Sequence, residues 1–217
     1  MLDISVVCPP MTTTVVHLLR HGEVANPHHV LYGRLPGFHL SEEGQIQAKA
    51  AARHLAGHDV TALFSSPLER ALETAGALSE QFALPVTKDD RLIEAANHFE
   101  GLTFGVGDGS LLRPRHWPKL CNPFRPSWGE PYREIADRML AAMATAAIAA
   151  SGHEAVCVSH QLPIEVTRRW VDCRRLWHHP RNRRVALASI TSFTYTGDRV
   201  TAVDYWEPTG NSHQAGA

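Results

Sequence analysis

The sequence has no apolar run of about 18 residues, the length that a membrane-spanning helix requires. The N-terminal residues, among them Asp3, Pro9 and Pro10, do not resemble a signal peptide. The four cysteines lie far apart and form no CxxC pair, so the sequence carries no zinc signature and predicts reduced thiols. These absences together predict a soluble, cytoplasmic protein.

The chain also lacks an excess of charge of either sign, because its formal net charge is −1. That balance argues against a protein whose whole surface binds nucleic acid or membrane. There is no HExxH spacing, which disfavours a metal-activated water. The adjacent pairs His28-His29 and His178-His179 are poor metal candidates, since adjacent residues seldom converge on one ion. We therefore expect neither a metal nor another cofactor in the reaction.

Apolar runs alternate with amphipathic stretches along most of the 217 residues. This alternation predicts an α/β protein with a largely parallel sheet and a final hairpin at its edge. The predicted strands are 15–20, 60–65, a short one near 85–88, 154–159, 188–195 and 199–206, and the predicted helices are 42–56, 67–82, 132–150 and 162–171.

The domain is predicted to be single and to span residues 14–207, between a flexible leader, 1–13, and a flexible tail, 208–217. Residues 95–129 break the pattern, because glycines and prolines are interleaved there with aromatic residues. A long irregular segment of this kind predicts an ordered functional loop or cap. The sequence leaves open whether Met1 or Met11 is the true start. It also leaves the oligomeric state open, and the exposed edge of such a sheet is compatible with a homodimer.

Charged and imidazole side chains follow three of the predicted strands. Arg20 and His21 end the first strand, Arg70 opens the helix after the second, and His160 follows the third. We expect Ser66 to cap that helix, in a capping box that starts it at residue 67. If the three strands are neighbours, all these side chains meet where open α/β sheets bind ligands.

The expected cluster suits phosphate chemistry. Arginine forks bind phosphate oxygens in bidentate fashion, and a helix N-terminus adds backbone donors for an anion. Two arginines and an imidazole around a second imidazole fit phosphoryl transfer to nitrogen better than acyl transfer, which needs a Ser or Cys nucleophile.

At this point the motifs resemble those of the histidine phosphatase superfamily, branch 1, which includes the cofactor-dependent phosphoglycerate mutases. The resemblance covers residues 14–206 and implies a phosphoglycerate mutase-like, three-layer α/β/α sandwich. It rests on Leu19-Arg20-His21-Gly22-Glu23 with Asn26, Leu40-Ser41-Glu42-Glu43-Gly44, Ser65-Ser66-Pro67-Leu68-Glu69-Arg70-Ala71, Leu92-Ile93-Glu94, Gly129-Glu130 and Val158-Ser159-His160.

The resemblance implies a role for each matched residue. His21 would be the nucleophile that becomes a phosphohistidine. Arg20, Arg70 and His160 would bind the phosphoryl group and stabilise its charge, and Asn26 would add a phosphate contact. We expect the glycine after His21 to allow close approach of the backbone to the phosphate.

The resemblance also implies that Glu94 is the general acid that protonates the leaving oxygen and then the base that activates water. Such an acid needs a raised pKa, which apolar neighbours such as Phe99 would help to supply. Glu23, Glu100 and Glu130 are the rival carboxylates for this role.

The sequence departs from the family pattern in three places; the first and third bear mainly on substrate choice, and the second leaves the role of Glu130 open. Gln161 stands where many relatives have glycine, and we expect its side chain to crowd or contact the substrate. Gly129-Glu130-Pro131 replaces the usual Gly-Glu-Ser, and the segment after Glu94 matches loosely.

We therefore expect a metal-independent phosphatase that hydrolyses a small phosphorylated metabolite, with no nucleic acid or membrane partner. Two alternatives stay open, a phosphoglycerate mutase-type transfer and a catalytically weak phosphate-binding regulatory module. Residues 168–184 carry seven arginines against one aspartate and are either a solvated face or a basic rim for an anionic substrate or partner. Further candidates for the substrate's non-reacting anionic end are Arg113, Arg115, His116 and Lys119.

Overall fold

The computed structural model describes residues 12–103 and 129–208. The strands in these ranges form one sheet in the order β3-β2-β4-β1-β5-β6. The strands β1, β4, β2 and β3 run parallel, whereas β5 is antiparallel to β1 and β6 to β5. Their bounds are β1 Thr13–Arg20, β2 Val60–Ser65, β3 Thr87–Lys88, β4 Glu154–Ser159, β5 Ile190–Thr196 and β6 Arg199–Trp206. The predicted sheet, mostly parallel with an antiparallel edge, is confirmed.

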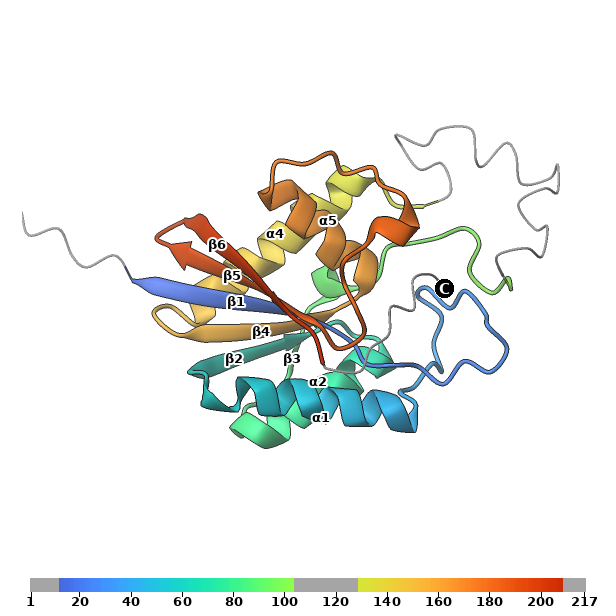
Figure 1. Cartoon of the computed structure of the whole chain (residues 1–217), viewed down its shortest axis with the longest axis horizontal. Coiled ribbons are helices and arrows are strands. Elements are labelled where there is room, and N and C mark those ends of the chain that lie inside the picture. The colour runs from blue at the N-terminus through green and yellow to red at the C-terminus, as the bar shows by residue number, and fades with distance from the viewer. Residues whose placement is uncertain (1–11, 104–128, 209–217) are drawn as a thin grey trace, which may run out of the picture.

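Helices cover both faces of the sheet, as Figure 1 shows. Helices α1 (Glu42–His54) and α2 (Glu69–Phe82) pack together on one face. Helices α4 (Tyr132–Ala149) and α5 (Gln161–Val171) pack together on the other. Short 3₁₀ turns, η1 (Leu55–Gly57), η2 (Asp90–Leu92) and η5 (Pro180–Asn182), lie in the connections. The three-layer α/β/α arrangement is therefore confirmed.

Strand β1 is buried on both faces, which explains its nearly continuous apolar sequence. Val16 and Leu18 are fully buried in the core beneath α4 and α5. Leu19 is fully buried in the second core, beneath α1 and α2. The strand therefore runs through the middle of the molecule and ends at Arg20 with little freedom to move.

The predicted start of the second helix is wrong. Helix α2 begins at Glu69, and its N-cap, Leu68, forms no side-chain capping bond. Glu69 instead accepts a hydrogen bond from the backbone N–H of Gly37. Arg70 still lies in the first turn, as predicted, and is completely buried.

Several predictions concern residues outside the described ranges. These are the leader apart from residues 12 and 13, the tail apart from Pro208, and residues 104–128 of the predicted cap with Arg113, Arg115, His116 and Lys119. Thr13, the last residue of the predicted leader, begins β1. Within the described ranges, no helix combines the length and apolar character needed to cross a membrane.

Candidate active site

The strand order brings the three predicted strand ends together, because β4 lies between β1 and β2. The backbone N–H of His21 donates to the carbonyl of Ser159 over 3.1 Å, and that of Ser66 donates to the carbonyl of Val158 over 2.9 Å. The residues that follow β1, β2 and β4 therefore meet at one edge of the sheet (Figure 1). The predicted convergence of Arg20, His21, Arg70 and His160 is confirmed.

His21 is held with one ring nitrogen toward its own backbone. Its Nδ1 lies 2.7 Å from the carbonyl oxygen of Gly22, and because a carbonyl only accepts, Nδ1 carries the proton. Burial lowers the pKa of His21 well below its ordinary value, and the charges of Arg70 and Arg20 lower it further. His21 is therefore a neutral imidazole whose Nε2 keeps its lone pair.

Two guanidinium groups flank this imidazole, that of Arg70 fully buried and that of Arg20 partly buried. Arg20 donates from Nη1 to the carbonyl of Val185 over 2.8 Å, and Arg70 donates from Nη2 to the carbonyl of Gly33 over 2.6 Å. The guanidinium of Arg70 also lies over the ring of Tyr32, 4.8 Å from its centroid. Within the described ranges neither arginine forms an ion pair with a carboxylate, and Arg20 Nε, Arg70 Nε and Arg70 Nη1 have no hydrogen-bond partner. Buried, unpaired cationic donors favour the binding of an anion.

His160 connects Arg70 to a serine. Its Nδ1 lies 3.3 Å from Arg70 Nη2, which only donates, so Nδ1 accepts and Nε2–H donates to Ser66 Oγ over 2.8 Å. The rings of His160 and His21 lie 5.1 Å apart between centroids. Burial, followed by the charges of His21 and Arg70, lowers the pKa of His160 well below its ordinary value. The hydroxyl of Ser66, which the sequence assigned to helix capping, keeps only a long contact of 3.4 Å with the backbone N–H of Leu68, and its shorter bond orients this imidazole.

Glu94 lines a cavity of about 780 Å³ together with His21 and Arg20. Its Oε1 accepts a hydrogen bond from the backbone N–H of Ala95 over 2.8 Å. Burial raises the pKa of Glu94, although this hydrogen bond and the charge of Arg70 oppose the effect. The pKa is therefore shifted in the direction that a carboxyl acid working near neutral pH requires.

The rival carboxylates are engaged in structural contacts. Glu130 pairs with Arg34 over 2.8 Å and with Arg138 over 2.7 Å. Glu23 accepts a hydrogen bond from the hydroxyl of Ser41, the N-cap of α1, over 3.0 Å. Glu100 accepts one from a neighbouring backbone N–H over 3.2 Å. Glu94 combines a place on the cavity wall with a raised pKa.

A comparison with protein families agrees with this geometry. The family model of the histidine phosphatase superfamily, branch 1, matches residues 16–208. The chain belongs to this superfamily.

The relatives of this chain include named phosphatases. An uncharacterised protein of Mycobacterium tuberculosis strain H37Rv is 54% identical over 195 residues, which are 90% of this chain and 96% of that protein. A glucosyl-3-phosphoglycerate phosphatase of Mycolicibacterium vanbaalenii is 35% identical over 57% of this chain and 55% of its own length. The solved structure of a mycobacterial glucosyl-3-phosphoglycerate phosphatase with inorganic phosphate has a TM-score of 0.70 and 26% identity, and the match covers 89% of this chain and 97% of that chain.

Packing within the protein also requires the glycine after His21, and its expected close approach to phosphate stays a prediction. A Cβ atom on Gly22 would collide with the carbonyl oxygen of Gly44, and one on Gly44 would collide with that of Glu23. The Gly22 N–H also donates to Thr74 Oγ1 over 3.2 Å. The two glycines therefore let the first turn of α1 pack directly against the backbone after β1.

Asn26 lines the cavity, but both polar atoms of its amide bind the loop itself. Its Oδ1 accepts from the Val30 N–H over 3.0 Å, and its Nδ2 donates to the Val30 carbonyl over 2.8 Å. In this structure its contacts are those of a loop-forming residue, so the predicted phosphate contact would rest on its second amide hydrogen.

Sequence reasoning missed Arg183 as a residue of the cavity wall. Its Nη1 donates to Gln161 Oε1 over 3.1 Å and its Nε to His178 Nε2 over 3.2 Å. Gln161 also lines the cavity, as its position after His160 predicted. Two other arginines of segment 168–184, Arg168 and Arg169, pair with the fully buried Glu165. The arginine-rich composition was visible in the sequence, but not which member faces the cavity.

Proposed function

We propose that this histidine phosphatase is a metal-independent phosphomonoesterase that works through a phosphohistidine at His21. The observation that carries the proposal is the fixed tautomer of His21. The bond from Nδ1 to Gly22 leaves the Nε2 lone pair free to attack phosphorus, and burial with two nearby cations keeps that nitrogen unprotonated. An imidazole held in this state is an activated nucleophile.

In the first step, the lone pair of Nε2 forms a bond to phosphorus as the bond between phosphorus and the leaving oxygen breaks. The Glu94 carboxyl donates its proton to that oxygen, which leaves as an alcohol. In the second step, the Glu94 carboxylate takes a proton from water, whose oxygen attacks phosphorus and breaks the N–P bond. Inorganic phosphate leaves, and His21 and protonated Glu94 are restored.

The two arginines supply charge stabilisation. The unpaired donors Arg20 Nε, Arg70 Nε and Arg70 Nη1 are proposed to bind the phosphoryl oxygens, because positioned positive charge is the main requirement in phosphoryl transfer. The Nε2–H of His160, which donates to Ser66 in this structure, is proposed to be a further donor to the phosphoryl group. We propose that these groups stay rigid through the reaction, since Arg70 and His160 are fully buried.

A small phosphomonoester is the proposed substrate class. The cavity of about 780 Å³ falls in the size range of small-molecule sites. Support also comes from the relatives named as glucosyl-3-phosphoglycerate phosphatase. Gln161 and Arg183 are proposed to contact the part of the substrate that does not react.

The test compares the wild type with His21→Ala in the hydrolysis of an aryl phosphate, with and without EDTA. We expect His21→Ala to lose at least about 1,000-fold in kcat, because the covalent route disappears. The matched control is His153→Ala, which removes an exposed imidazole paired with Asp59 and should leave turnover unchanged. The wild type should keep its activity in EDTA and acquire an acid-labile phosphoryl label.

Unchanged turnover in His21→Ala, or strict dependence on a metal, would overturn the proposal. Isomerisation of 3-phosphoglycerate in the presence of its bisphosphate, faster than hydrolysis, would show a mutase instead. Tight binding of phosphoesters without labelling or turnover would show a regulatory phosphate-binding module.

A further inference from the structure

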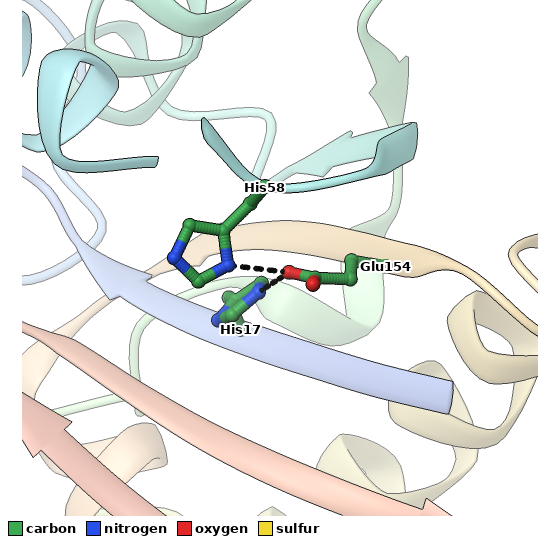
Figure 2. A group of neighbouring side chains, drawn as sticks. All are labelled: His17, His58 and Glu154. Carbon is green, nitrogen blue, oxygen red and sulfur yellow. Dashed lines mark hydrogen bonds and ion pairs between the residues drawn. The ribbon is translucent and has the colours of Figure 1, made fainter. Parts of the chain in front are cut away.

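Three side chains from distant parts of the sequence meet beside the middle of β1 (Figure 2). His17 comes from β1, His58 precedes β2, and Glu154 is the first residue of β4. Glu154 Oε2 lies 2.6 Å from His17 Nε2 and 2.8 Å from His58 Nδ1. These three ligand atoms lie within 4.8 Å of one another. His17 precedes His21 by four residues, or about 13 Å of strand.

We propose that His17, His58 and Glu154 bind one divalent transition-metal ion, with zinc as the best match. Two imidazole nitrogens and one carboxylate oxygen form a donor set that zinc commonly uses, with water as the fourth ligand. The proposal is independent of the phosphatase chemistry, because none of the three residues lines the cavity that holds His21.

The two N···O contacts need only a small opening to admit the ion. Tetrahedral zinc with bonds of about 2.0–2.1 Å places its ligand atoms about 3.3 Å apart. The two N···O contacts would therefore lengthen by about 0.5–0.7 Å. His17 is 2% exposed and held within the sheet, whereas the side chains of His58 and Glu154 are 39% and 20% exposed. The two outer ligands have room to move, and solvent reaches the position for a water ligand.

The second nitrogen of His17 already has the partner that a zinc-binding imidazole needs. Its Nδ1 lies 2.8 Å from the hydroxyl oxygen of Ser192, and the two residues are directly paired across β1 and β5. Without an ion, Nε2–H donates to Glu154, because a carboxylate only accepts, and Nδ1 accepts from the hydroxyl. In the metal-bound state the proton would sit on Nδ1 and be donated to the same hydroxyl, which leaves the Nε2 lone pair for the ion. Hydrogen bonds of this kind fix the tautomer and orientation of metal-binding histidines.

The surroundings favour a cation. The site lies just beyond the C-terminal end of α1, where the helix dipole is negative. Within the described ranges Glu154 forms ion pairs with the two imidazoles and with no lysine or arginine. A second histidine of the same segment, His54, has its ring 6.0 Å from that of His58. A bound ion would tie β1, β4 and the connection before β2 together.

The test is a titration of the EDTA-treated, desalted protein with Zn²⁺, followed by calorimetry and by thermal unfolding. We expect one ion per chain and a higher unfolding midpoint, because a ligand that binds only the folded state stabilises it. Glu154→Gln and His58→Gln should weaken binding by roughly 100-fold or more and abolish the shift in midpoint. His58→Gln is the safer variant, because that side chain is partly exposed and lies outside the strands.

The matched control is His39→Gln, which removes an exposed histidine that also pairs with a glutamate, Glu73. It should bind Zn²⁺ as the wild type does. Co²⁺ used as a spectroscopic probe should give the visible absorption of a four-coordinate site in the wild type and lose it in His58→Gln. The proposal is overturned if the wild type shows no saturable binding, or if folded His58→Gln and Glu154→Gln bind as tightly as the wild type.

Discussion

Replacement of Arg70 by methionine separates the role of a buried charge in catalysis from its role in folding. Arg70 is completely buried and has no carboxylate partner within the described ranges. Its side chain gives the fold one hydrogen bond to the Gly33 carbonyl, a weaker one to His160 and a contact with the ring of Tyr32. We expect Arg70→Met to remove most of the activity at little cost in stability.

The magnitudes follow from those contacts. The charged hydrogen bond to Gly33 contributes about 1.5–3 kcal/mol and the contact with Tyr32 about 0.5–2 kcal/mol. Against these, two buried donors of Arg70 are unpaired, at a cost of about 1–3 kcal/mol each. The two sums offset, so the free energy of unfolding without phosphate should change by no more than about 2 kcal/mol. Loss of two donors to the phosphoryl oxygens should lower kcat/KM by about 1,000-fold, or about 4 kcal/mol.

The assay combines hydrolysis rates with urea unfolding in the presence and absence of inorganic phosphate. Phosphate at 100 times its Kd should stabilise the wild type by about 2.7 kcal/mol and Arg70→Met by almost nothing. The matched control is Arg169→Met, which removes a buried arginine that does have a carboxylate partner, Glu165 at 2.6 Å. That control should lose about 3 kcal/mol of stability and keep the full phosphate effect.

The reasoning is refuted if Arg70→Met loses several kcal/mol without phosphate and phosphate still stabilises it as much as the wild type. That outcome would make Arg70 a structural residue.

Two further predictions concern proton transfer and protonation. Glu94→Gln should slow the hydrolysis of an alkyl phosphate by at least about tenfold more than the hydrolysis of p-nitrophenyl phosphate. The reason is that the leaving oxygen of p-nitrophenyl phosphate needs little protonation. Equal losses of rate with the two substrates would exclude Glu94 as the acid. His21 and His160 have pKa values well below 6.5 in the folded state, so the unfolded state binds more protons as the pH falls below about 6.5. Each histidine should then lower the free energy of unfolding by up to about 1.4 kcal/mol per pH unit on acidification. In His21→Asn, the slope of the free energy of unfolding against pH, measured by urea unfolding at several pH values, should decrease by that amount. An unchanged slope would contradict this assignment.

The edge of the sheet that holds the site could be predicted because it follows from chain order and periodicity. Buried strands of a parallel sheet present their carboxyl ends at one edge, so Arg20, His21 and His160 were placed there without knowledge of any contact. Their direct neighbours could not be derived in this way. Whether the imidazole of His21 binds a carbonyl through Nδ1 depends on the local backbone, and no periodicity encodes that.

Residues that belong to loops were the hardest to assign. The amide of Asn26 closes its own loop on Val30, and only the three-dimensional path of that loop shows it. Arg183 is one of seven arginines in segment 168–184. The sequence alone does not distinguish it from the neighbouring arginines that pair with Glu165. Its distinction is the contact with Gln161, 22 positions earlier in the chain. A long-range contact of this kind decides which of several equivalent charges faces a cavity.

Ser66 shows how one local pattern can have two physical outcomes. A serine followed three residues later by glutamate favours a capping box when no better partner is available. Here the fully buried hydroxyl lies 2.8 Å from His160 Nε2, a ring nitrogen that would otherwise be buried without a partner. An unpaired buried donor costs about 1–3 kcal/mol, whereas a helix cap is worth about 1 kcal/mol. The hydroxyl also accepts a longer bond, 3.4 Å, from the backbone N–H of Leu68, but α2 begins at Glu69, two residues later than predicted. The shorter, tertiary bond is the one that orients the imidazole beside the nucleophile.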